Sequence, residues 1–207
     1  MRKVLSGQIA ITVFLLASSL LFIYQYSHLF SFTAEALGKY FDVKWLLFGH
    51  IAPAACALLI GPFQFLKSIR NKNLKLHRLL GKLYMVCISI SSLSALALTF
   101  ITTNQVGKMY TISLWFLLLV WVVSTGMAYL SIRLRKIQEH EQWTVRSYIA
   151  TSAFIVQNYI LKVPALDTLG SFAEVSPNIF WFSWSIPLFA YQVYLTIIAL
   201  NKRTART

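Results

Sequence analysis

The sequence predicts an all-α polytopic membrane bundle with six transmembrane helices and both termini in the cytoplasm. Of the 207 residues, 57% are hydrophobic and only 12% are charged, about half the charged share of an average soluble domain. A soluble globule of this size needs more charge to cover its surface, and disordered chains are poor in apolar residues and rich in charge. The composition therefore excludes both of these classes of protein.

Six apolar stretches are each long enough to cross the ~30 Å hydrocarbon core as a helix of about 20 residues. They are expected to be helices because an open strand edge has no hydrogen-bond partners in lipid. The predicted spans are residues 8–30, 45–65, 79–101, 110–132, 144–161 and 178–200, of which 144–161 is the most polar. The first stretch exceeds the ~7–15 apolar residues of a signal peptide. We therefore expect it to be retained, and residues 1–207 to form a single integral membrane domain.

The basic residues indicate how the chain is oriented in the membrane. Fifteen of the 19 Lys and Arg residues lie in the segments 2–3, 67–82, 133–146 and 202–206, which the six spans place on one side. The other side has four, and basic loops are typical of the cytoplasmic side. We therefore interpret the net charge of +13 as a topology signal. Some of these residues are expected to meet anionic lipid headgroups of the bilayer, and no nucleic-acid partner is expected.

The second span carries a stripe of small and polar residues at helical spacing. Its members are His50, Ala54, Ala57, Gly61 and Gln64. Small residues allow another helix or a flat ligand to approach closely. Pro62 has no backbone N–H, so we expect the helix to kink or end near Gly61 and to leave backbone carbonyls for local partners. His50 lies nearer the outer face, where a hydrogen bond to another helix is the more ordinary role.

A second group of polar residues is predicted to meet at the cytoplasmic face, where span two ends and spans three and five begin. This cytoplasmic cluster comprises Gln64, His77, Arg78, Gly81, Tyr84, His140, Glu141, Trp143 and Arg146. Two helix N-termini with free N–H groups point toward it. Glu141 is expected to neutralise Arg78 or Arg146. These residues are the candidate ligand- or cofactor-binding residues, together with His50.

Other polar or reactive side chains lie inside the predicted spans. Gln157 and Asn158 are deep in the fifth span, toward its outer half, and two adjacent amides at that depth need partners or water. Cys56 and Cys87 are predicted to lie at similar depth. Their spacing is not that of a metal site, so they are either packing residues or a redox pair.

Three runs of residues together resemble a known family. They are Gly61-Pro62-Phe63-Gln64-Phe65, His77-Arg78 with Gly81 and Tyr84, and His140-Glu141 with Trp143 and Arg146-Ser147-Tyr148. The combination resembles the bacterial multi-pass membrane proteins grouped as domain of unknown function 2306, over residues 45–160. His50 also matches a histidine of that family, whereas Asn158 stands where an arginine is common. The resemblance implies a helical bundle in the bacterial plasma (inner) membrane and no particular activity.

The first interpretation of the cytoplasmic cluster is a b-type haem site for electron transfer. Haem in a helical bundle needs two axial histidines from different helices at matched depth, with small residues beside the ring. His77 and His140 meet the depth condition and would be the metal ligands if haem b is the cofactor. Gly81 would make room for the ring, and Arg78 or Arg146 would pair with a propionate.

Two other interpretations remain open at this point. The cluster could bind or transport a lipid, a quinol or a small anion without redox chemistry, or it could be purely structural, anchoring helix ends. The sequence has no GxSxG or HExxH motif and no P-loop. It therefore gives no support to hydrolysis or nucleotide-driven work, and whether the protein is an enzyme stays open.

Overall fold

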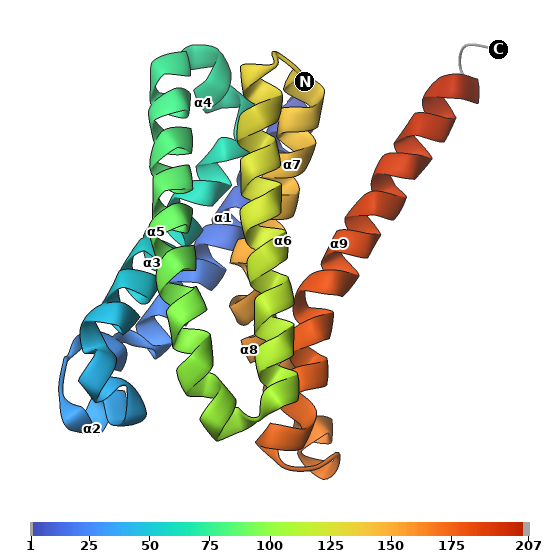
Figure 1. Ribbon diagram of the computed structural model, residues 1–207. Coiled ribbons are helices and arrows are strands. Elements are labelled where there is room, and N and C mark those ends of the chain that lie inside the picture. Colours follow the sequence, from blue (N-terminus) through green and yellow to red (C-terminus); the bar gives the residue numbers. More distant parts are fainter. Residues whose placement is uncertain (1, 205–207) are drawn as a thin grey trace.

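The computed structural model describes residues 2–204, and the chain is helical over most of this range, with no strand among the described residues. Figure 1 shows a bundle of long helices joined by short connections. The elements are α1 (Arg2–Gln25), η1 (Ser27–Phe30), α2 (Ala34–Leu37), η2 (Gly38–Val43), α3 (Lys44–Gln64), α4 (Lys67–Lys72), α5 (Leu74–Val106), α6 (Lys108–Arg133), α7 (Ile137–Thr151), α8 (Ala153–Leu161), η3 (Pro164–Thr168) and α9 (Phe172–Thr204).

Five stretches of the described chain are long and apolar enough to cross a membrane. They are Gly7–Gln25, Ala34–Gln64, Leu74–Ile101, Lys108–Arg133 and Phe172–Lys202. Each overlaps one of the predicted spans. Large apolar side chains on their outer faces are exposed, such as Phe14 at 67% and Leu93 at 73%, as expected of helices that face lipid on one side and protein on the other.

The stretch predicted as span 144–161 is built as two helices. α7 ends at Thr151 and α8 begins at Ala153; α7 packs against α6, whereas α8 packs mainly against α9. At the break the Thr151 hydroxyl donates to the Ser147 carbonyl at 2.9 Å, and the Ser152 hydroxyl donates to the Ile149 carbonyl at 3.1 Å. Such side-chain bonds compete with the helical ladder, which explains why this segment is interrupted.

The ends of several helices differ from the predicted spans. α1 ends at Gln25, and the remaining apolar residues of the predicted stretch form the 3-10 turn η1. α5 begins earlier than predicted because the Asn73 side chain caps it, accepting from the Leu76 N–H at 3.0 Å. Hydropathy reports which residues prefer lipid, whereas caps and turns decide where a helix stops.

The short segments 67–78 and 133–143 join spans two and three and spans four and five, and such short connections predict two antiparallel helical hairpins; the structure confirms both. α3 packs against α5 with α4 in their connection, and α6 packs against α7 (Figure 1). The start of α1, helix α4, the α6–α7 turn and the last turn of α9 lie at one end of the bundle, which we call the α4 end. The opposite end holds α2, the α5–α6 turn and η3, and we call it the α2 end.

The core is concentrated where α3, α5, α6, α7 and α9 meet. Its buried members include Ala57, Tyr84, Ile88, Trp121, Tyr148, Ala153, Phe180 and Trp184. A smaller cluster of Leu37, Leu47 and Leu98 closes the α2 end. Beyond Trp184 no residue of α9 with described burial is buried, and this half of the helix diverges from its neighbours in Figure 1.

Candidate functional site

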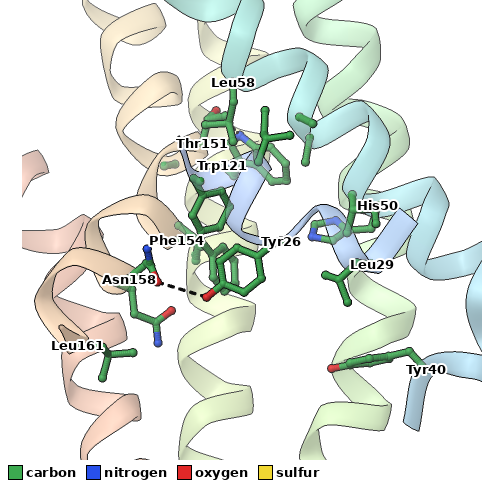
Figure 2. Close-up of a pocket in the computed structure, with 18 of the residues that line it drawn as sticks. Tyr26, Leu29, Tyr40, His50, Leu58, Trp121, Thr151, Phe154, Asn158 and Leu161 are labelled. Atoms are coloured by element: carbon green, nitrogen blue, oxygen red, sulfur yellow. Dashed lines mark hydrogen bonds between the residues drawn. The ribbon is translucent and has the colours of Figure 1, made fainter. Parts of the chain in front are cut away.

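A cavity of about 420 Å³ opens inside the bundle, in the half nearer the α2 end (Figure 2). A second cavity of about 360 Å³ shares several of its wall residues, including His50 and Tyr110, and therefore adjoins it. The walls of the larger cavity come from α1, η1, η2, α3, α6, α7, α8 and α9. We call the two adjoining cavities together the His50 cavity. Each lies in the size range of small-molecule sites, ~300–1,000 Å³.

The walls of the His50 cavity are mainly apolar and aromatic, with a few polar groups among them. The apolar residues include Phe22, Leu29, Ala54, Leu58, Leu117, Trp121, Phe154 and Phe172. The polar residues are Tyr26, Tyr40, His50, Tyr110, Thr151, Gln157 and Asn158. The larger cavity has no Asp, Glu, Lys or Arg among its described wall residues. Such a composition is typical of sites for neutral, mostly apolar ligands.

His50 is held in one orientation by Ser91 of α5, which confirms the predicted hydrogen bond between helices. The Ser91 hydroxyl donates to the His50 backbone carbonyl at 2.9 Å, so its proton is already engaged. The ring atom Nδ1 lies 2.8 Å from that hydroxyl oxygen and 3.0 Å from the Ser91 carbonyl oxygen. Because both of these Ser91 oxygens act as acceptors, the proton of the His50 ring is assigned to Nδ1. Nε2 is then an acceptor, and the ring extends from α3 into the cavity (Figure 2).

The opposite wall is a polar contact between α1 and α8. Asn158 and Gln25 form a mutual amide pair, with donor–acceptor distances of 3.2 and 3.1 Å. The Tyr26 hydroxyl donates to the same Asn158 oxygen at 3.3 Å (Figure 2), and Lys162 donates to Gln25 at 2.8 Å. Gln157 hydrogen-bonds to Tyr110. Both deep amides therefore have the partners that their position requires.

A buried hydroxyl network joins α5, α6 and α7 beside the cavity. Thr151 accepts from the Trp121 indole N–H at 2.8 Å and lies 2.9 Å from the Tyr84 hydroxyl. Tyr84 also lies 3.0 Å from Ser147, which is 2.7 Å from Thr125. Tyr84 was predicted to join the cytoplasmic cluster, but its hydroxyl belongs to this network instead. Tyr84 lies ten residues beyond the start of α5 at Leu74. Although side chains of a helix lean toward its N-terminus, this one therefore stays deeper in the bundle than the first turn of α5.

Part of the predicted cytoplasmic cluster does assemble at the α4 end. His77 interacts electrostatically with His140, Arg70, Arg78 and Glu141. Glu141 pairs with Arg70 of α4, so the expectation that it would neutralise Arg78 or Arg146 is wrong. The reason is that the short helix α4, absent from the prediction, carries Arg70 to the first turns of α7. Arg78 is exposed.

His140 and Gln64 also lie at the α4 end, with different partners. The His140 atom Nδ1 lies 2.8 Å from the Ala128 carbonyl, which assigns the ring proton to Nδ1 and leaves Nε2 unprotonated. Gln64 lies against Gly81, where a Cβ atom would stand 3.3 Å from the Gln64 side-chain oxygen. The amide therefore already fills the space that the missing side chain of Gly81 leaves.

Trp143 and Arg146 face α9 and not the histidines. The Arg146 guanidinium donates to the Gln192 side chain at 2.8 Å. Its central carbon lies 4.8 Å from the Trp143 ring centre and 5.4 Å from that of Tyr191, within the range of cation–π contacts. The predicted cluster is thus divided between the α4 end, the hydroxyl network and the α7–α9 contact.

The α4 end does not fit haem. A ring ligated by His77 and His140 needs a flat slot between the helices, and Gly81 was expected to provide it, but Gln64 occupies this position. Arg146, an expected propionate partner, is engaged by α9.

Cys56 of α3 and Cys87 of α5 were predicted to lie at similar depth, and the structure brings them together. Their thiols hydrogen-bond to one another. Cys56 is exposed and Cys87 is partly exposed, so the pair lies on the outside of the bundle and does not belong to the His50 cavity.

Sequence reasoning did not find the His50 cavity, although it singled out His50, Gln157 and Asn158. Tyr26, Tyr40 and Tyr110 lie near span ends, where aromatic residues ordinarily anchor a helix at the membrane interface. One signal did point to the cavity, namely the two adjacent amides deep in the fifth predicted span. The convergence of these residues depends on how the helices are rotated, which is not visible in a single span.

Comparison with family models gives a match to DUF2306, described as a predicted membrane protein, over residues 47–195. Searches of curated proteins and of solved structures gave no match. The matched range runs from α3 into α9 and includes His50, the hydroxyl network and Asn158, while Gln25 and Tyr26 precede it. The resemblance noted from the sequence is thereby confirmed, and the chain belongs to the DUF2306 family of predicted membrane proteins.

Proposed function

We propose that this protein crosses the bacterial inner membrane six times, with both termini in the cytoplasm, and binds a neutral, mostly apolar small molecule in the His50 cavity. The proposed ligand class is quinol-like, with an apolar body and a hydroxyl group on the ring. The observation that carries the proposal is a largely apolar cavity of about 420 Å³ inside the bundle of apolar helices, with one imidazole acceptor projecting into it.

The six-span topology is supported by the continuity of α7 and α8. Together they run from Ile137 to Leu161 with Ser152 between them, and ~20 residues of helix cross the hydrocarbon core. The basic segments 67–82 and 133–146 both adjoin the α4 end, and basic loops are typical of the cytoplasmic side. A fluorescent reporter that folds only in the cytoplasm, fused after the last residue, should be bright. A dark fusion with an active periplasmic reporter would reject this topology.

The ligand class follows from the groups that line the cavity. His50 Nε2 accepts a hydrogen bond, so it suits a hydroxyl donor such as a phenol. The amide and phenol groups of Gln157, Asn158 and Tyr110 on other walls suit oxygen atoms elsewhere on the same molecule. The absence of charged side chains from the described walls of the larger cavity disfavours an ionised ligand, because a charge buried without a partner is costly.

The cavity is placed for a ligand that arrives from the bilayer. Its walls are carried by helices whose outer faces are exposed apolar surface. α1 and α8 meet there through the Gln25–Asn158 amide pair, and the cavity wall includes Phe22 and Tyr26 on one side and Asn158 on the other. A gap between these helices would admit a molecule that partitions into lipid.

Binding is tested with a short-chain quinol, decylubiquinol, titrated into the purified protein in nanodiscs. Trp121 lines the cavity, so quenching of its fluorescence should report binding, and Trp121→Phe identifies that signal among the six tryptophans. Ala54→Phe should fill the cavity and abolish saturable quenching. The matched control Ala97→Phe adds the same ring at an exposed position and should bind normally. Equal quenching in both variants, or none in the wild type, would reject the site.

A further inference from the structure

Two nitrogen atoms at the α4 end are buried without any hydrogen-bond partner. They are the amide nitrogen Nε2 of Gln64 and the ring nitrogen Nδ1 of His77. Only two other buried side-chain atoms of the described residues are in this state, on Ser176 and Trp184 of α9. Buried polar groups are nearly always paired, so an exception calls for a ligand, ion or water that completes it.

Both unpartnered nitrogens belong to the same small region between the end of α3 and the first turns of α5. The Gln64 side chain lies on Gly81, within 3.3 Å of where a Cβ would be. His77 precedes Gly81 by one helical turn and lies on the same face of α5. The close approach of Gln64 is possible because position 81 is a glycine, and it brings the amide to the turn that carries His77.

The surroundings of these nitrogens carry an excess of basic groups. His77 interacts electrostatically with His140, Arg70 and Arg78, and with one carboxylate, Glu141. That carboxylate is already paired with Arg70. His140 is fixed by its Nδ1 bond to the Ala128 carbonyl at 2.8 Å, which leaves Nε2 for a further partner. Positive charge and the unpartnered amide N–H of Gln64 together select a negatively charged acceptor, and His77 Nδ1 is a second donor in the tautomer that carries its ring proton there.

We propose that Gln64, His77 and His140 form a binding site for an oxyanion of the phosphate type at the α4 end of the bundle. Gln64 Nε2 donates one hydrogen bond to it and His77 Nδ1 donates a second, while His140 stands beside His77 with its own Nδ1 proton held by the Ala128 carbonyl. The phosphate is either free or part of an anionic lipid headgroup, since the chemistry of recognition is the same. This site is separate from the His50 cavity and does not depend on the quinol proposal.

A metal ion fits these observations less well than an oxyanion does. The nitrogen of a side-chain amide has no lone pair to give to a metal, so Gln64 Nε2 would stay unpartnered. Among the residues that the structure describes, no third His, Cys, Asp or Glu completes a metal-binding group with the two histidines.

The test measures inorganic phosphate and phosphatidylglycerol binding to the full chain in a non-phospholipid detergent. Phosphate is titrated by calorimetry, and lipid retention is measured by native mass spectrometry. Gln64→Leu and His77→Phe should each weaken whichever species binds by at least tenfold. Ser176→Ala, which removes another unpartnered buried group far along the chain, is the matched control and should bind like the wild type.

The outcomes separate the two sources of phosphate from failure of the proposal. Saturable phosphate binding in the wild type indicates a free anion, whereas retention of phosphatidylglycerol with no phosphate binding indicates a lipid headgroup. Unchanged gel-filtration profiles show that the variants are folded, and Gln64→Glu, which keeps the size of the side chain but adds a negative charge, should abolish binding. No binding of either species, equal binding in all variants, or stoichiometric Zn²⁺ binding with no phosphate binding would overturn the proposal.

Discussion

The hydroxyl of Tyr148 donates a hydrogen bond of 3.1 Å to the backbone carbonyl of Leu58. This is the carbonyl that Pro62, four residues later in α3, cannot serve because proline has no N–H. The Ser19 hydroxyl approaches the same oxygen at 3.5 Å. The expectation that Pro62 would leave a carbonyl for local partners is confirmed, and the partners come from α7 and α1.

Tyr148→Phe should therefore destabilise the protein by about 1–3 kcal/mol, the cost of leaving a buried acceptor unsatisfied. The loss should appear as a lower midpoint in denaturant unfolding of the detergent-solubilised protein. Tyr194→Phe, which removes a hydroxyl from a side chain that is 57% exposed, should leave the midpoint unchanged. Equal stability of the two variants would show that the Leu58 carbonyl finds another donor.

Gly61→Ala should destabilise the protein through overpacking, by ~1–3 kcal/mol. A Cβ at this position would lie 2.3 Å from two atoms of the Tyr148 ring and 3.3 Å from the Tyr84 ring. Gly126→Ala is the matched control in another long helix, because its Cβ would meet nothing within 4 Å. Thermal unfolding of both variants checks the prediction, and a loss at Gly126 equal to that at Gly61 would contradict it.

Ser91→Ala should weaken decylubiquinol binding about tenfold, which corresponds to the ~1–1.5 kcal/mol of one hydrogen bond. The Ser91 hydroxyl lies 2.8 Å from the His50 ring nitrogen and donates to the His50 backbone carbonyl at 2.9 Å. Ser91→Ala removes both bonds and leaves only the Ser91 backbone carbonyl on the ring, so the acceptor nitrogen is held less firmly toward the cavity. Ser89→Ala is the control, since Ser89 is bonded to Met85 of its own helix. Fluorescence titration of the two variants distinguishes a positioning role from a general effect of serine removal.

The Arg70–Glu141 ion pair predicts which charge-reversal variants will restore stability to one another. Its side chains are 33% and 50% exposed, so removing the pair should cost under about 1 kcal/mol. Glu141→Arg should lower the unfolding midpoint, and the double variant with Arg70→Glu should restore it. The double variant Glu141→Arg with Arg78→Glu should keep the lowered unfolding midpoint. Rescue by Arg78 and not by Arg70 would favour the partner expected from the sequence.

Mild oxidation with copper-phenanthroline should join Cys56 and Cys87, because their thiols are in contact on the exposed side of α3 and α5. The two thiols lose two hydrogen atoms to the oxidant and form one disulfide bond. Intact-mass measurement should find this loss, together with protection from maleimide labelling. Cys87→Ser abolishes the product. A wild-type protein that keeps both thiols labelled under these conditions would contradict the α3–α5 register.

Much of this fold could be predicted from local patterns in the sequence. The apolar stretches, the two hairpins and the interhelical role of His50 follow from hydropathy, loop length and the cost of a polar group in lipid. The break at Ser152 was not predicted, because Thr151 and Ser152 interrupt the ladder through side-chain bonds that hydropathy does not register.

The candidate sites were less predictable than the fold. Nine residues were predicted to meet at one face of the membrane because they lie at similar depth. Depth alone does not determine the direction in which a side chain points. Tyr84 and Arg146 are on the helices to which they were assigned, but their side chains hydrogen-bond to Thr151 and Gln192. Their direction depends on how each helix is rotated about its axis, which is set by packing against neighbours.

The amino-acid sequence by itself determined that the chain is a helical membrane protein, where its apolar helices lie and which end of the bundle is basic, since hydropathy and charge are properties of each segment alone. Only the tertiary structure decided that Gln25 meets Asn158, 133 positions away, and that a cavity remains beside His50. Pairings and voids of this kind arise from the tilt and rotation of whole helices, and many arrangements of the same helices would satisfy the same pattern of lipid-facing residues.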